Sequence, residues 1–227
     1  MRAGVLIAAV ACVSVVALAT LSHADERVQI TATDGVQLVG HLAGREGPGI
    51  VFGHMYPADQ RSWTAFAEEM ANAGFRTLTF DFRGYGESGG EKDIAAIDRD
   101  MEGAYRFLIG RKIRPVYLVG ASMGGTAALI VASRVPVAGL ATLSAPVAFR
   151  GLDAAPALPK VTTRTLFLAA EADQPAADAV KQFATHAADP KTILLVPGSE
   201  HGTALFDGPQ AAAVKKALRD FLATPLP

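Results

Sequence analysis

The feature that most constrains the fold is an alternation of short apolar runs with segments of helical spacing. The apolar runs that follow the first thirty residues are GIVFG, RTLTFDF, PVYLVG, VAGLATLSAP, RTLFLAAEAD and KTILLVPG. The segments between them carry apolar residues three or four positions apart, such as Trp63, Phe66 and Met70 in one and Met101, Tyr105 and Leu108 in another. Because such spacing gathers side chains on one helical face, we expect these residues in the core. The alternation predicts an α/β fold, with a mostly parallel sheet and helices on both of its faces.

Two further patterns concern the edges and the interior of this sheet. The stretch RVQITATDGVQLVGHLA has two strand-like runs about the turn signal Asp34-Gly35, which predicts an N-terminal antiparallel hairpin. The runs VYLVG, TLFLAA and TILLV are almost wholly apolar, as expected of strands buried on both faces. Ligands of such sheets bind at the carboxyl ends of the strands, so the polar residues that follow these runs are the first candidates for a site.

Ser122 lies where an apolar strand-like run turns into an apolar helix-like run, in VYLVGASMGGTAALIV. Gly120-Ala121-Ser122-Met123-Gly124 has the G-x-S-x-G spacing of a nucleophile elbow in the strand-to-helix context that this motif requires. A strand that reverses into a helix within about one residue forces the serine into a sparsely populated backbone conformation, and the glycines remove side chains that would collide. We therefore predict Ser122 as a nucleophile, with the N–H of Met123 directed at the oxyanion.

A serine hydroxyl needs a base within reach and an acid that orients the base. For this elbow the chain order is serine, then aspartate or glutamate, then histidine. Glu171 and Asp173 follow one apolar run, and His201 follows the next and precedes a glycine, where a histidine has no packing role. His201 is thus the predicted base, while either carboxylate can be the acid on position alone.

From about Arg27 to its end, the chain resembles an α/β-hydrolase. Besides the elbow, DFRGYGESGG resembles the D-x-R-G-x-G-x-S loop common after the fourth strand of that family, and VFGHMYPADQRSW resembles the segment after the third. The resemblance implies that Ser122 is the nucleophile, Asp173 the acid and His201 the base. It also implies an oxyanion hole formed by the backbone N–H groups of Met123 and Tyr56.

The oxyanion segment departs from the family pattern. Relatives commonly have His-Gly before the oxyanion residue, whereas this chain has His54-Met55-Tyr56, without the glycine. Either Met55 adopts the same backbone shape or the hole is remodelled. His54 is expected to brace this segment, and Asp81 and Arg83 to fasten their loop by hydrogen bonds and an ion pair, because buried charges need partners.

Composition excludes several partners and cofactors. Asp and Glu total 22 and Lys and Arg total 21, so no broad charge field favours nucleic acid or an anionic membrane. The histidines are scattered, no H-E-x-x-H occurs, and the turn glycines lack a P-loop Lys-Ser pair, so we expect neither metal nor nucleotide. The expected partner is a small molecule, and the oligomeric state stays open.

The first residues predict export. Arg2 precedes a mainly apolar run from Val5 to Leu21 that contains no charged residue, and Ser22 and Ala24 fit a small-x-small cleavage site. We therefore expect a signal peptide over residues 1–24 and a single hydrolase domain over residues 25–227, periplasmic or secreted, without stable membrane association once the signal is cleaved. The alternative is an uncleaved anchor, since the run has the minimum length of a membrane span.

The predicted function is that of a serine hydrolase acting on a small carboxylic ester without a cofactor. A peptidase, a thioesterase or lactonase, and a perhydrolase of the haloperoxidase type share the triad, because function lies in the pocket rather than the fold. A non-catalytic binding protein is the alternative of another class.

The stretch from Pro146 to Thr165 has only about twenty residues, three of them prolines, which is too few for a helical lid. Its shortness predicts an open cleft and a preference for short acyl chains. A small flap of Phe149, Leu152 and Leu158 is the alternative.

Overall fold

The computed structural model of the chain describes residues 25–224, so the predicted signal peptide, residues 1–24, lies outside the described residues, as do residues 225–227. The strands are β1 (Glu26–Thr31), β2 (Gln37–Ala43), β3 (Gly49–Gly53), β4 (Arg76–Phe80), β5 (Val116–Ala121), β6 (Gly139–Leu143), β7 (Ala148–Phe149), β8 (Leu152–Asp153), β9 (Thr165–Ala170) and β10 (Lys191–Val196). The helices are α1 (Thr64–Asn72), α2 (Ile97–Gly110), α3 (Met123–Ala132), α4 (Gln174–His186) and α5 (Ala211–Ala223). Short 3-10 helices cover Gln60–Trp63, Ile94–Ala96, Leu158–Lys160 and Gly202–Phe206.

Eight strands form one sheet in the order β1-β2-β4-β3-β5-β6-β9-β10. β1 pairs antiparallel with β2, and β2 antiparallel with β4, whereas every other pair in this sheet is parallel. The predicted hairpin about Asp34-Gly35 and the mostly parallel sheet are thus confirmed. The parallel pairing places the carboxyl ends of β3, β5, β9 and β10 along one edge of the sheet.

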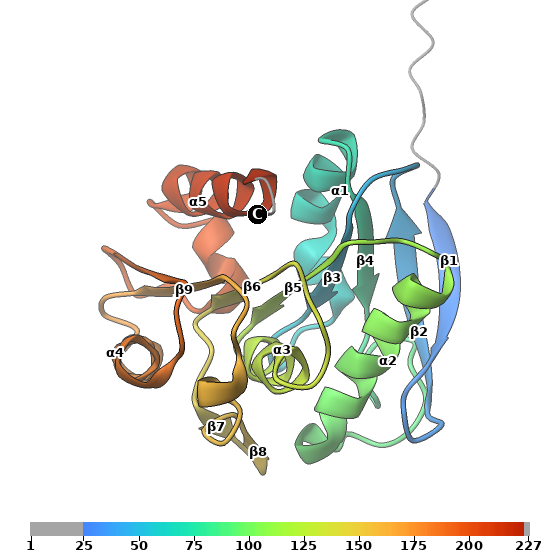
Figure 1. The fold of residues 1–227 in the computed structure, drawn as a ribbon, viewed down its shortest axis with the longest axis horizontal. Helices are drawn as coiled ribbons and strands as arrows, with labels where there is room; N and C mark the ends of the chain where they lie inside the picture. The colour runs from blue at the N-terminus through green and yellow to red at the C-terminus, as the bar shows by residue number, and fades with distance from the viewer. Residues whose placement is uncertain (1–24, 225–227) are drawn as a thin grey trace, which may run out of the picture.

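The helices cover both faces of the sheet, as the alternation of patterns predicts. Figure 1 shows α1 and α5 on one face and α2, α3 and α4 on the other. Trp63, Phe66 and Met70 belong to the apolar cluster under α1 and α5, and Met101 and Leu108 to the cluster on the opposite face. Within residues 25–224 no helix has the length and apolar character needed to cross a membrane.

One strand differs from its prediction. The run TILLV in β10 was expected to be buried on both faces, but β10 is the last strand of the sheet and most of its residues are partly or fully exposed. The side chain of Ile193 is 37% exposed. An apolar run predicts that a segment forms a strand of the sheet. Whether that strand lies at the centre or the edge depends on where the last crossover of the chain ends.

Candidate active site

The elbow has the strained geometry that the sequence predicts. Ser122 joins the end of β5 to the start of α3 with φ 49° and ψ −122°, and its N–H donates to the carbonyl of Leu143 at 2.8 Å. A Cβ atom at Gly120 would collide with the backbone of Gly124, and one at Gly124 would collide with the carbonyl oxygens of Gly53 and His54. The two glycines therefore allow the sharp turn and let the segment after β3 lie directly against α3.

Three side chains form a continuous hydrogen-bonded relay at the carboxyl ends of the strands. The Ser122 Oγ lies 2.8 Å from Nε2 of His201, and Nδ1 of the same ring lies 2.7 Å from Oδ2 of Asp173. Since the carboxylate only accepts, Nδ1 carries the proton and Nε2 is free to accept the proton of the serine hydroxyl. The side chain of Asp173 is 10% exposed and that of His201 is 43% exposed, so the imidazole ring is open to solvent.

The carboxylate that contacts His201 is Asp173, three residues beyond the end of β9. Glu171 stands directly after β9 and is exposed, with its N–H bonded to the carbonyl of Val196. The two extra residues carry Asp173 to the start of α4, where its side chain faces the loop after β10. The structure thus brings Ser122, Asp173 and His201 together.

The segment after β3 lies beside the relay. The would-be Cβ of Gly202 meets the sulfur of Met55, and the hydroxyl of Thr203 lies 3.6 Å from that sulfur, so Met55 packs against the loop that carries His201. Met55 is not among the residues with positive φ, so this position needs no glycine. The sequence departure from the family pattern therefore causes no backbone strain, and Tyr56 follows at the rim of the site, 38% exposed.

The oxyanion role of two backbone N–H groups stays a prediction. Met123 is the first residue of α3, and the first N–H groups of a helix have no acceptor inside it. The backbone at Gly53 and His54 touches Gly124, which brings the segment that continues to Tyr56 to the same helix end. In the reaction that the sequence predicts, donors at that point face the negative charge that develops on the carbonyl oxygen.

His54 braces this segment, as expected from the sequence. Its ring is fully buried, Nδ1 lies 3.0 Å from the carbonyl of Met55, and Nε2 accepts the N–H of Phe82 at 3.0 Å. Burial lowers the pKa of His54, although its contact with the Met55 carbonyl opposes that shift. The ring is therefore neutral and fixes the distance between the segment after β3 and the loop after β4.

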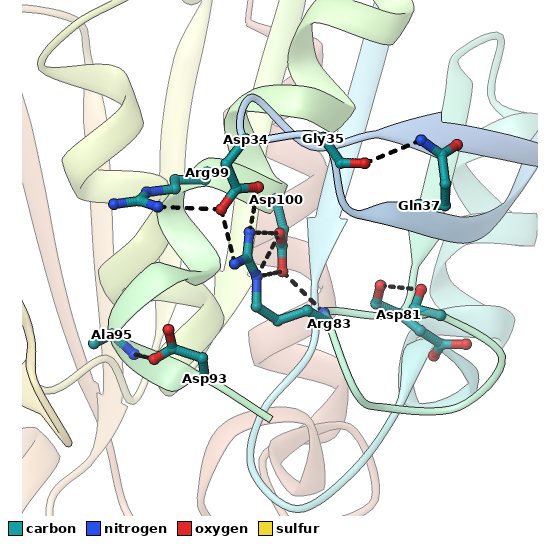
Figure 2. A network of polar contacts seen from close by, with 10 residues as sticks. Asp34, Gly35, Gln37, Asp81, Arg83, Asp93, Ala95, Arg99 and Asp100 are labelled. Atoms are coloured by element: carbon teal, nitrogen blue, oxygen red, sulfur yellow. Dashed lines mark hydrogen bonds and ion pairs between the residues drawn. The ribbon is translucent and has the colours of Figure 1, made fainter. Parts of the chain in front are cut away.

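The loop after β4 is fastened by two separate sets of bonds. Asp81 accepts the N–H and the side-chain amide of Gln60, both at 2.9 Å. Figure 2 shows Arg83 between Asp34 and Asp100, with the guanidinium 2.8 Å from an oxygen of Asp34 and 2.6 Å from one of Asp100. The ion pair expected for this loop thus joins it to the β1–β2 turn and to α2.

Other polar features lie away from the relay. His41 contacts Asp25 in the hairpin, and His186 bonds to Gln182 at the end of α4. A cavity of about 710 Å³ between α1, β2 and β4 is lined by none of the three relay residues. In the part of the chain that the structure describes, no three His, Cys, Asp or Glu side chains are grouped so as to hold a metal ion.

Sequence reasoning missed part of the rim. Arg150 stands at the turn between β7 and β8, and its guanidinium carbon lies 4.4 Å from the ring centroid of Tyr56 and 5.3 Å from that of Phe149. The two rings lie 6.0 Å apart. In the sequence, only Gly151 suggests a turn at this point. No periodicity connects Arg150 with Tyr56, which lies 94 positions earlier.

Comparison with known proteins adds the family and the fold. A family model described as "alpha/beta hydrolase fold" matches residues 48–223. An uncharacterized protein of Mycobacterium tuberculosis is 26% identical in an alignment that is 226 residues long including gaps. The match covers 88% of this chain and 79% of that protein.

Solved structures of similar fold include two enzymes. A dienelactone hydrolase from Anabaena variabilis has a TM-score of 0.77 and 22% identity, covering 90% of this chain and 99% of that one. An esterase from Pyrococcus furiosus has a TM-score of 0.78 and 16% identity, covering 91% of this chain and 93% of that one. At identities this low, the similarity of the structures shows a shared fold and not a shared activity.

Proposed function

This chain belongs to the α/β-hydrolase fold family, and from that premise we propose that it is a serine hydrolase that cleaves a small carboxylic ester through an acyl-enzyme on Ser122. The observation that carries the proposal is the unbroken relay from Ser122 through His201 to Asp173 at a strained strand-to-helix turn. Such a relay serves nucleophilic acyl transfer, because a hydroxyl is unreactive until a base takes its proton.

The relay residues have separate roles in the proposed reaction. His201 Nε2 takes the proton of Ser122 as the hydroxyl oxygen attacks the acyl carbon, and Asp173 stabilises the imidazolium that forms. The N–H groups of Met123 and Tyr56 bind the oxyanion, and the proton on His201 passes to the departing alcohol. A water molecule, deprotonated by the same ring, then releases the acid and restores Ser122.

The choice of an ester over other acyl substrates is supported by the open site. An ester has a good alcohol leaving group and needs less transition-state stabilisation than an amide. The exposed ring of His201 also admits the hydrolytic water. Thioesters and lactones fit the same relay, as does perhydrolysis with peroxide in place of water, and the solved relatives named above include an esterase and a dienelactone hydrolase.

A fluorophosphonate probe tests the proposal, since it modifies serine only where a relay activates the hydroxyl. The wild-type protein is expected to be labelled at Ser122 and to hydrolyse 4-nitrophenyl butyrate. In Ser122→Ala, labelling disappears and kcat falls by a factor on the order of 10³ to 10⁶. Ser133→Ala is the matched control, because Ser133 lies at the other end of α3.

A folded wild-type protein that takes no label and hydrolyses no ester or amide would contradict the proposal and favour a binding protein. Circular dichroism and thermal melting establish that each variant is folded. A panel of 4-nitrophenyl esters, anilides and thioesters of one acyl group then separates an esterase from a peptidase and a thioesterase.

A further inference from the structure

Arg150 occupies a backbone position that ordinarily selects a different residue. It precedes Gly151 in the two-residue turn between β7 and β8, and the two residues have φ 46° and 89°. A turn with positive φ at both positions is most often Asn-Gly or Gly-Gly, because other side chains are strained there. An arginine is unusual in this position, and what distinguishes it from other exposed cations is the set of contacts that hold its guanidinium.

The guanidinium of Arg150 is held by aromatic rings and not by a carboxylate. It lies over Tyr56 at 4.4 Å and over Phe149 at 5.3 Å, and it forms no ion pair with any residue that the structure describes. In the described part of the chain the guanidinium donates no hydrogen bond, so its N–H groups are available to a ligand. An arginine so fixed presents a ready fork of donors to a planar anion.

This fork lies at the rim of the catalytic site. Tyr56 directly follows Met55, whose sulfur contacts the loop of His201. On the other side, the hairpin of β7 and β8 lies beside α3, the helix that begins directly after Ser122 (Figure 1). The hydroxyl of Thr126 in α3 donates to the carbonyl of Pro146 at 2.7 Å and so fastens the start of that hairpin segment. Arg150 is therefore held between the segment that packs on the loop of His201 and the hairpin that packs on the helix after Ser122.

We propose that Arg150 binds the carboxylate of an acid-bearing ester, so that the preferred substrates are monoesters of short dicarboxylic acids. The inference rests on the proposed esterase function and specifies its substrate class. Carboxylate is the planar anion that matches a guanidinium edge with two parallel hydrogen bonds. The reacting ester carbonyl lies at Ser122, while the free acid at the far end of the acyl chain reaches the rim.

The test compares two esters that differ only in this acid group, 4-nitrophenyl hexanoate and the 4-nitrophenyl monoester of adipic acid. The selectivity is the ratio of kcat/KM for the adipate to that for the hexanoate. We expect the wild-type protein to favour the adipate, and Arg150→Asn to lower the ratio by about five- to thirtyfold, as for loss of a charged hydrogen bond near solvent. Arg150→Lys keeps the charge without the fork and should give an intermediate ratio.

A matched control comes from the opposite end of the sheet. Lys112 is also an exposed cation with positive φ, 61°, but it precedes β5, far from the carboxyl ends of the strands. Lys112→Asn should leave the ratio unchanged. Thermal melting adds a second readout, because asparagine suits a left-handed turn and Arg150→Asn should keep or raise the melting temperature while selectivity falls. Added 0.5 M NaCl should lower the wild-type ratio by screening the exposed charge.

The outcomes separate this inference from the function on which it rests. If the wild-type protein hydrolyses hexanoate and takes the fluorophosphonate label, but the ratio is the same in Arg150→Asn, the carboxylate subsite is wrong and the esterase stands. A wild-type ratio below one overturns the inference in the same way. If neither ester is hydrolysed and no label is taken, both fall.

Discussion

Ser122 has a strained backbone conformation that the surrounding structure must hold in place. Its left-handed φ of 49° is unfavourable for a side chain, yet the backbone is fixed by a bond to Leu143 on the neighbouring strand and by the first turn of α3. The same conformation lifts the hydroxyl toward His201. The strained backbone of Ser122 and the position of its hydroxyl in the relay therefore have the same structural origin.

The first prediction at this scale concerns the acid. Asp173→Asn should lower kcat by a factor on the order of 10⁴, because an amide can hydrogen-bond His201 in the wrong tautomer and cannot stabilise its positive charge. Glu171→Gln is the matched control and should change kcat less than about threefold, since Glu171 does not contact the ring. Both are measured on 4-nitrophenyl butyrate. The reverse order of effects, with both variants folded, would make Glu171 the acid.

At the scale of elements, the connection from β6 to β9 decides how the site meets solvent. This stretch, residues 144–164, contains the hairpin of β7 and β8 and one short 3-10 helix, so no large lid is present. Leu152 and Leu158 are buried in the core cluster around α3 and do not fold over the relay. Only Phe149 of the alternative flap reaches the rim, where it contacts Tyr56.

The second prediction follows from this short connection. Without a lid, a long acyl chain leaves its outer methylenes in water and forgoes about 0.8 kcal/mol for each, which is about fourfold in binding. We therefore expect kcat/KM to rise from 4-nitrophenyl acetate to about the hexanoate and then to level off or fall at octanoate and palmitate, each measured below its aggregation limit. A steady rise to palmitate would indicate an enclosed lipase-like pocket.

At the scale of the whole molecule, charged groups join segments that lie far apart in sequence. Arg83 connects the loop after β4 to Asp34 in the first hairpin and to Asp100 in α2 (Figure 2). Hydrogen bonds from Arg83 lower the pKa of Asp34 to about 2, against the opposing effect of burial. Because Arg83 holds the loop that also bonds His54, this network supports the oxyanion segment from a distance.

The third prediction concerns stability against pH. A carboxylate whose pKa is lower in the folded protein contributes stability above the pKa of the unfolded chain, near pH 4, and this stability is lost as the pH falls toward about 2. Because Asp34 is partly open to solvent, Asp34→Asn should lower the free energy of unfolding at pH 7 by only about 1 kcal/mol, and the difference from wild type should shrink below pH 4. Urea unfolding at pH 7, 4 and 2.5 measures it.

The matched control for this prediction is Asp178→Asn. Asp178 pairs with Lys181 on the solvent side of α4, and both side chains are exposed. Surface pairs of this kind contribute little, so the variant should unfold within about 0.5 kcal/mol of wild type at every pH. A pH-independent loss in Asp34→Asn would show that packing and not charge sets the effect.

Patterns among neighbouring residues of the sequence were enough to predict the fold and much of the candidate site. Alternating strand-like and helix-like runs specify the layers, because burial of a strand and of a helical face leaves different periodicities. The glycines about Ser122 and the residue order along the chain predicted Ser122 and His201, and the family resemblance selected Asp173 over Glu171. The structure joins these three side chains in one relay. These signals are readable because each depends on neighbours in sequence.

Tertiary structure alone decided the features that depend on distant neighbours. The exposed place of β10 and the pairing of Arg83 with Asp34 and Asp100 follow from how strands and loops pack. Arg150 over Tyr56 is the clearest case, since neither residue has a local pattern that refers to the other. Sequence periodicity encodes which side of an element is buried, whereas side-chain partners across the molecule are fixed only when the whole chain has folded.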